Sequence, residues 1–174
     1  HLERFIPLYC EMMKPKCKIA KTFEELLNKV IGMIRPQYQV RVLRRSEKVN
    51  IVDCAVAKPV DNSMVSADIL ECGSLMGIKE PQVGMTVKKS GRSSGVTHSM
   101  IVATDVAIKV NVSETEYGIF TDQVLIGSMS LPGDSGSIIL TEDNFAIGLL
   151  FAGSELATMA NRIDNVFDAL HVRI

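Results

Sequence analysis

Short apolar runs with strand-like alternation dominate the sequence. Nine such runs predict strands, at residues 2–9, 37–43, 49–56, 67–72, 84–89, 100–112, 117–125, 137–140 and 145–151. Breaks containing Gly, Asn or Ser separate them, at the spacing typical of barrels and sandwiches. The pattern therefore predicts an all-β protein.

Two segments have helical periodicity instead. Thr22 and Glu25 form a capping box, and apolar residues then recur at helical spacing as far as Pro36, which a helix cannot include. This predicts an inserted helix over about residues 22–34, with Thr22 as its N-cap. A second, closing helix is predicted over about residues 162–171, with an apolar face formed by Ile163, Val166, Phe167 and Leu170. Both apolar faces are interpreted as packing surfaces.

Composition narrows the classes of function. Hydrophobic residues make up 47% of the 174 residues and charged residues 22%, which is enough apolar surface for a folded core. Nineteen Lys plus Arg against twenty Asp plus Glu give a net charge of −1, so no nucleic-acid partner is expected. No run of 18 apolar residues occurs, so no membrane partner is expected either.

The four cysteines, Cys10, Cys17, Cys54 and Cys72, lack the paired spacing of a zinc site and are too sparse for a disulfide scaffold. We expect them to be reduced, with a Cys10–Cys17 disulfide as the alternative. We expect neither a metal nor a cofactor.

The segment Gly133-Asp134-Ser135-Gly136-Ser137 carries the chemistry. Its glycines can adopt backbone angles that let successive N–H groups face one concavity while the Ser135 hydroxyl faces outward. This suits a nucleophile in acyl transfer, with the N–H groups of Gly133 and Ser135 as an oxyanion hole. A plain Gly-rich hairpin turn is the alternative. An α/β-hydrolase elbow fits less well, because Ser137 replaces the second glycine of that motif and the apolar strand follows the serine.

This segment resembles the nucleophile signature of trypsin-like (chymotrypsin-fold) serine peptidases of bacterial type. Three further segments agree. Residues 49–57 resemble the strand that carries the family's catalytic aspartate, residues 87–97 its K-S-G-R-T-T-G-x-T turn, and residues 148–154 the strand that lines the specificity pocket. The resemblance covers roughly residues 49–174.

The resemblance implies a chymotrypsin-like double β-barrel and a set of site residues. The first barrel, over residues 1–74, would be incomplete and contain the inserted helix, and residues 75–174 would form the second barrel and the closing helix. Asp53 would orient a histidine that takes the Ser135 proton. Asp134 would support the oxyanion loop through a charge-assisted hydrogen bond. The substrate pocket would be lined by Met129, Phe151, Ala152 and Gly153.

The catalytic histidine departs from the family pattern, in which it precedes the aspartate. His98 and His171 both follow Asp53, and His1 is the chain's first residue, where termini tend to fray. Only 52 residues precede Asp53, too few for the inserted helix and six strands. We therefore expect this chain to be the C-terminal portion of a longer protein, nearly inactive alone, whose upstream segment carries the histidine.

The function predicted from the sequence is thus a serine endopeptidase acting on peptide or protein substrates. A non-catalytic interaction module with the same fold is the alternative from another class. A third hypothesis pairs Ser135 with His171 and either Asp164 or Asp168, but leaves little room for the separate strands that such a triad needs. Unpaired strand edges of an incomplete barrel invite pairing with a second copy or with the chain's own N-terminal segment.

Overall fold

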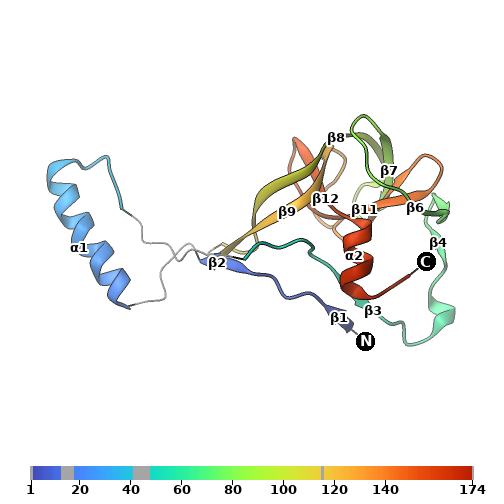
Figure 1. The fold of residues 1–174 in the computed structure, drawn as a ribbon, viewed down its shortest axis with the longest axis horizontal. Coiled ribbons are helices and arrows are strands. Elements are labelled where there is room, and N and C mark those ends of the chain that lie inside the picture. Colours follow the sequence, from blue (N-terminus) through green and yellow to red (C-terminus); the bar gives the residue numbers. More distant parts are fainter. Residues whose placement is uncertain (1, 13–17, 41–47, 115, 174) are drawn as a thin grey trace. The chain divides into compact units, whose positions relative to one another are not determined.

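A computed structural model describes residues 2–12, 18–40, 48–114 and 116–173 (Figure 1). The chain divides into two compact units. The first contains residues 1–8, 50–108 and 120–174, and the second contains residues 9–49 and 109–119. These units differ from the two barrels expected on either side of residue 74, and that division stays a prediction.

Six strands form a closed ring. They are β7 (Thr86–Gly91), β8 (Gly95–Asn111), β9 (Glu116–Gly127), β10 (Ile138–Thr141), β11 (Phe145–Gly153) and β12 (Ala157–Arg162). The pairing order is β10-β7-β8-β9-β12-β11, and β10 also pairs with β11, so the sheet closes on itself as a barrel. Its interior is filled by the cluster Val87, Ile101, Val124, Ile126, Met129, Ile139, Ile147, Leu150 and Ala160.

Shorter strands lie outside this ring. β6 (Gly77–Ile78) adds in parallel to β11, and β2 (Cys10–Met12) adds antiparallel to β9. β1 (Leu2–Phe5) pairs with β3 (Ala55–Ala57), and β4 (Asp68–Ile69) pairs with β5 (Gly73–Ser74). A short 3₁₀ helix at Asn62–Met64 lies between β3 and β4. Within the described residues these strands form two-stranded pieces and no second ring, in agreement with an incomplete first barrel.

The helix α1 (Lys18–Ile34) begins four residues before the expected start. The Thr22 hydroxyl donates to the carbonyl oxygen of Lys18 at 3.0 Å, so Thr22 lies within the helix and the prediction that it caps the N-terminus is wrong. The end of the helix before Pro36 agrees with the prediction.

The closing helix α2 (Ile163–Leu170) agrees with the sequence pattern. His171 ends it in a left-handed conformation, with φ of 55°. Ile163, Val166 and Leu170 are buried, and Val166 and Leu170 pack with Val52 and Cys54. The helix therefore covers the segment that contains Asp53.

Several strand predictions differ from the structure. Residues 37–40 are not a strand, and residues 41–43 of the same predicted run lie outside the described residues. β12 was not predicted, because Thr158, Met159, Ala160 and Asn161 are all buried and the strand has no alternation of apolar and polar residues.

The structure also bears on the cysteines, on membrane-spanning helices and on metal sites. Cys54 and Cys72 are free thiols, whereas Cys17 lies outside the described residues, so the alternative of a Cys10–Cys17 disulfide stays untested. Among the helices that the structure describes, none combines the length and apolar character needed to cross a bilayer. No group of three or more His, Cys, Asp or Glu suited to a metal ion occurs in the described part of the chain.

Candidate active site

The loop between β9 and β10 presents Ser135 to solvent. Gly133 and Gly136 have φ of +101° and +89°, which side-chain-bearing residues rarely adopt. The Asp134 N–H donates to the Leu131 carbonyl oxygen at 3.0 Å, and the Gly136 N–H donates to the Leu150 carbonyl oxygen at 2.8 Å. These bonds fix the loop on both sides of Ser135, whose side chain is exposed.

The N–H groups of Gly133 and Ser135 are left available. Ser93 Oγ donates to the Pro132 carbonyl oxygen at 2.7 Å, and the Ser137 N–H and Oγ donate to the Asp134 carbonyl oxygen at 3.0 and 2.6 Å. In a trans peptide the N–H points away from the carbonyl, so both N–H groups point away from these partners. No described residue accepts a hydrogen bond from either. This is the donor pair that an oxyanion hole needs.

A buried ion pair supports the loop from behind. The Lys89 Nζ lies 3.2 Å from Asp134 Oδ2, and both side chains are fully buried. The Asp134 carboxylate also accepts hydrogen bonds from the Ser93 N–H at 2.8 Å, the Leu131 N–H at 2.9 Å and the Ser94 hydroxyl at 2.6 Å. The role expected for Asp134 thus has a physical partner in Lys89, which the sequence analysis did not single out.

Hydrogen bonds to the Asp134 carboxylate stabilise its ionised form. Burial alone raises the pKa of Asp134, but the hydrogen bonds to its carboxylate, led by that of the Ser94 hydroxyl, outweigh burial and hold the pKa well below its ordinary value of 3.8. A lowered pKa adds stability above pH 3.8 that is lost as the pH falls toward the folded-state value. The loop therefore weakens only in strong acid.

Asp53 is held by its backbone on the same barrel. Its N–H donates to Asn161 Oδ1 at 2.8 Å, Asn161 Nδ2 donates to Gln123 Oε1 at 2.7 Å, and Gln123 Nε2 donates to the Ile51 carbonyl oxygen at 2.7 Å. Asn161 and Gln123 are fully buried side chains of β12 and β9. These amides, and not a β-ladder, hold residues 51–53, which explains why the strand predicted at 49–56 is regular only at Ala55–Ala57.

The Asp53 carboxyl is half-buried, and its charge acts on the neighbouring Cys54 thiol. Desolvation raises its pKa, and no described residue donates a hydrogen bond to it. The adjacent Cys54 thiol is buried, and its pKa is raised to about 11 by burial and by the Asp53 charge. A desolvated carboxylate without a donor is costly to fold, and such groups concentrate at functional sites.

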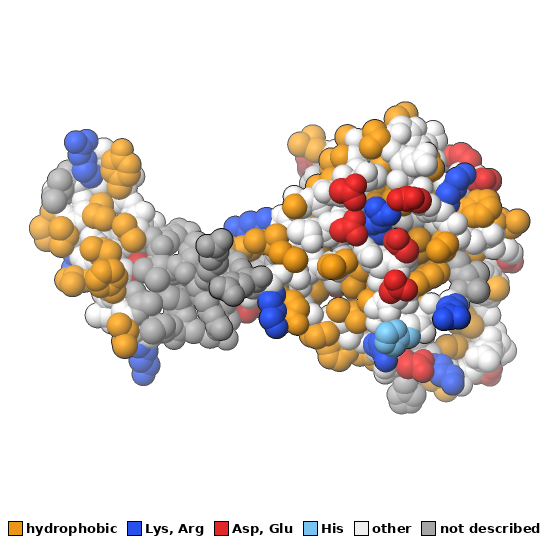
Figure 2. All heavy atoms as spheres, viewed as in Figure 1, with side chains coloured by type: hydrophobic (Ala, Val, Ile, Leu, Met, Phe, Trp, Pro, Cys, Tyr) orange, Lys and Arg blue, Asp and Glu red, His pale blue; other side chains and the backbone are white. Residues whose placement is uncertain are grey.

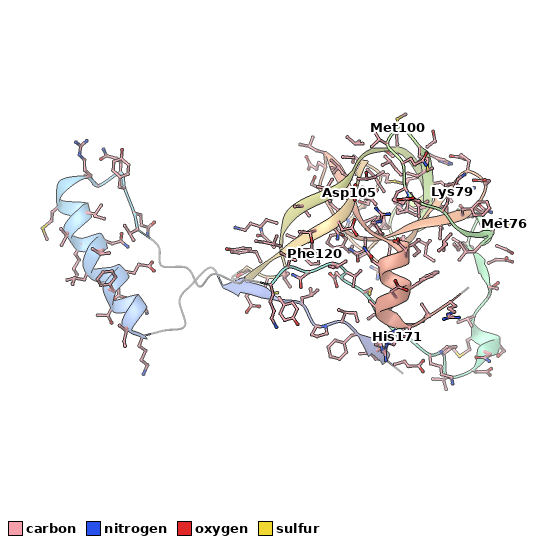
Figure 3. The ribbon with its side chains drawn as sticks, viewed as in Figure 1. Met76, Lys79, Met100, Asp105, Phe120 and His171 are labelled. Atoms are coloured by element: carbon pink, nitrogen blue, oxygen red, sulfur yellow. The ribbon has the colours of Figure 1, made fainter. Side chains whose placement is uncertain are left out.

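Ser135 and Asp53 line one groove of about 460 Å³. Its other walls are mainly apolar and include Ile6, Leu149 and Phe151. The Phe151 ring packs on Phe120, with the ring centroids 4.9 Å apart, and Phe120 is labelled in Figure 3. The two polar groups singled out from the sequence therefore meet in one hollow.

A second cleft of about 720 Å³ adjoins Ser135 on its other side. Gly153, expected in the substrate pocket, lines this cleft together with Ser128, Ser130, Ser154 and Glu155. A Cβ at Gly153 would lie 2.6 Å from Ser130 Oγ, so a side chain at Gly153 would disturb this wall. Ser135 lies where the groove and the cleft meet.

Three expected pocket residues lie elsewhere. Met129 points into the barrel core, with 5% of its surface exposed, so its neighbours Ser128 and Ser130 face the cleft instead. Phe151 lines the groove, and Ala152 lines neither hollow. β9 ends at Gly127, so Met129 lies just beyond the strand, with its side chain buried and its two serine neighbours lining the cleft.

Neither described histidine reaches Ser135. His98 is exposed on β8, opposite Lys88 of β7, and His171 is exposed at the end of α2 (Figure 3). Neither lines the groove with Asp53. His1 lies outside the described residues. The described chain thus brings Ser135 and Asp53 to one groove, beside a loop with two available N–H groups, and neither described histidine lines that groove.

Structural comparison places this arrangement among known folds. The chain is similar to Cellulomonas bogoriensis chymotrypsin (TM-score 0.52, 22% identity, 58% of this chain and 55% of that one) and to Thermobifida fusca protease A (0.53, 19%, 61% and 57%). It is also similar to a glutamic acid specific serine protease (0.51, 20%, 62% and 58%). The chain has the chymotrypsin-like fold of bacterial serine proteases. It spans little more than half the length of these proteases. No protein-family model and no curated protein matches it.

Two supporting residues were missed from the sequence, although one had a signal. Lys89 shares the inward face of its strand with Val87, and an inward lysine requires a buried acid. Ser93 had no such signal, because its role depends on the position of the Pro132 carbonyl oxygen.

We predict that Lys89→Met lowers the free energy of unfolding by about 3 kcal/mol, because it leaves the Asp134 charge buried without its cation. Urea unfolding at neutral pH measures this. Lys88→Met is the matched control, since Lys88 lies on the opposite face of the strand and only donates to the Glu142 carbonyl oxygen. Equal losses in the two variants would contradict a special role for the ion pair.

We predict that Asp53→Asn raises the free energy of unfolding at pH 7, because it removes a desolvated charge. A raised folded-state pKa means that the penalty appears as the pH rises above 3.8, so the gain should vanish in acid below that value. Urea unfolding of the wild type and the variant across this pH range measures the difference. A variant less stable than the wild type at pH 7 would refute the prediction.

Proposed function

We propose that this chain carries the nucleophile, the acid and the oxyanion hole of a serine endopeptidase. The observation that carries the proposal is that Ser135 and Asp53 line one groove beside a loop with two available N–H donors. A plain hairpin turn needs neither a buried ion pair beneath the serine nor a carboxylate across from it.

The reaction follows from this placement. Ser135 Oγ attacks the carbonyl carbon of a peptide bond, and the N–H groups of Gly133 and Ser135 stabilise the negative charge that forms on the oxygen. A histidine in the groove takes the Ser135 proton and returns it to the leaving amine, while Asp53 orients the ring and stabilises its cation. Water then hydrolyses the acyl-enzyme by the reverse proton transfers. This histidine belongs outside the described residues.

The cleft beside Ser135 indicates the kind of substrate. Three serine side chains and the exposed, unpaired carboxylate of Glu155 line the side on which the residue before the scissile bond would lie. These groups suit a polar or cationic side chain better than an apolar one. The apolar side chain of Met129 does not alter this preference, because Met129 is buried and does not line the cleft.

A non-catalytic interaction module is the second candidate. The position of His98 and His171 outside the groove favours it, as do the apolar residues Leu2 and Phe5, exposed by 64% and 61% on the two-stranded piece of β1 and β3. Such a piece offers edges to another strand. Pairing with a second copy or with the chain's own upstream segment stays a prediction.

We predict that free imidazole accelerates labelling of Ser135 by a fluorophosphonate probe at least tenfold, because a general base contributes about 10²–10⁴ to such reactions. The groove of about 460 Å³, lined by both Asp53 and Ser135, has room for an imidazole ring. The measurement is the rate of adduct formation by mass spectrometry at pH 8, where imidazole is neutral. Asp53→Asn should reduce the acceleration.

Matched variants separate the hypotheses. Ser135→Ala should abolish the adduct, whereas Ser63→Ala, at an exposed serine, should not change it. His98→Ala and His171→Ala should keep the response to imidazole. Loss of labelling in His1→Ala would assign the base to His1. Labelling that ignores imidazole, or that persists in Ser135→Ala, would favour the interaction module.

We predict that Ser93→Ala slows the labelling by up to about 10²-fold, because it frees the peptide that presents the Gly133 N–H, and one oxyanion donor is worth about 10²–10³. The imidazole concentration for half-maximal rate should not change, since Ser93 does not touch the groove. A purely structural role would lower stability by about 1 kcal/mol and leave the rate unchanged.

A further inference from the structure

Helix α1 carries a continuous apolar stripe that nothing described covers. Ile19, Phe23, Leu26, Val30 and Met33 follow one another at alternating spacings of four and three residues, which aligns them along one side of the helix. Their side chains are 81%, 55%, 60%, 49% and 83% exposed. Figure 2 shows hydrophobic side chains gathered along this helix, with Lys and Arg near its ends. The sequence analysis interpreted this face as a packing surface.

Two hydrogen bonds hold α1 to the chain segment that follows it. Asn28 donates through Nδ2 to the Val40 carbonyl oxygen at 2.9 Å and accepts from the Val40 N–H through Oδ1 at 2.8 Å. Leu27 and Ile31, beside Asn28, are half-buried. The apolar stripe is therefore the side that the returning chain leaves uncovered.

The sequence segment that contains this helix is strongly positive, although the whole chain carries only −1. Residues 9–49 contain ten Lys or Arg and four Glu, a net charge of +6, so the remaining residues carry −7. At 100° per residue, Lys18 and Lys29 lie on one flank of the stripe, and Glu24 and Glu25 lie farther from it. Glu25 is paired with Lys21 at 3.9 Å.

A binding partner of the α1 stripe must therefore accept apolar side chains and supply negative charge. A second copy would bring another segment with a net charge of +6 against the same face, which charge repulsion opposes. A nucleic acid would supply charge but would not take up Phe23 or Met33. An anionic bilayer does both, because an amphipathic helix sinks its apolar side below the headgroups while flanking lysines reach the phosphates.

We propose that α1 lies flat on an anionic lipid bilayer, with the stripe from Ile19 to Met33 turned into it. This differs from the expectation of no membrane partner, which rested on the absence of a run of 18 apolar residues. The mode of binding needs no spanning segment. It is independent of the peptidase proposal, since no residue of the stripe lines the groove or the cleft.

The test is co-sedimentation of the full 174-residue chain with vesicles of phosphatidylglycerol and phosphatidylcholine, compared with phosphatidylcholine alone. We expect binding to the anionic vesicles at least tenfold tighter, and weaker in high salt. Phe23→Gln with Met33→Gln should abolish it. Lys18→Gln with Lys29→Gln should weaken it about 25-fold, at roughly fivefold for each lysine near the surface.

Controls of the same chemistry lie in the other unit. Val60→Gln, at a side chain 87% exposed, and Lys79→Gln should leave binding unchanged, as should Ser135→Ala. Circular dichroism verifies that each variant is folded. The proposal is overturned if the Phe23 and Met33 variant binds as the wild type does, which would indicate a purely electrostatic polyanion site. It is also overturned if the chain forms dimers through the stripe without binding vesicles, or if anionic vesicles do not bind it.

Discussion

The buried contact between Lys89 and Asp134 is the interaction on which the nucleophile loop depends. It joins β7 to the loop that carries Ser135, and the same carboxylate collects the N–H groups of Ser93 and Leu131. The position of the Asp134 carboxylate also explains why residue 91 is a glycine, because a Cβ at Gly91 would lie 2.6 Å from the Asp134 carboxyl carbon. A charge inside a barrel is tolerable only with such complete coordination. The resulting stiffness keeps the Gly133 and Ser135 N–H groups oriented before any substrate arrives.

Ser135 lines both a groove and a cleft, and each of these hollows suits a different part of the proposed reaction. On one side lies a mainly apolar groove with Asp53 at its wall, where an imidazole would be shielded from water. On the other lies a polar cleft lined by Ser128, Ser130 and Glu155, where a substrate side chain would sit. The hydroxyl at the junction can therefore meet a base and a carbonyl carbon from different directions. Backbone bonds to Leu150 keep this junction in register with β11.

Much of the fold could be predicted from the sequence, because most strands of the ring carry a regular pattern of apolar positions between breaks that contain Gly, Asn or Ser. The position of α2 was predicted for the same reason. β12 was missed because its buried positions include the polar residues Thr158 and Asn161, and the start of α1 was misplaced because the Thr22 hydroxyl bonds backward within the helix. The pattern of apolar and polar residues shows neither which polar side chains are buried nor which backbone group a hydroxyl binds.

Part of the candidate site could likewise be predicted from the sequence, and part could not. Ser135, Gly133 and Asp53 could be found from short motifs, since each motif sits in one continuous stretch of chain. The Ser93 contact to Pro132, the amides of Gln123 and Asn161, and the inward turn of Met129 depend on residues 29 to 108 positions apart. Only the closed ring of strands brings them together.

The amide relay from Gln123 through Asn161 to the Asp53 backbone has a consequence for assembly. It mounts the acid on the same rigid body as the nucleophile, so their spacing does not depend on any other lobe. Under the proposed function, completing the site would require only an imidazole delivered to this groove. The chain would then become active through one docking event, without rearranging Ser135 or Asp53.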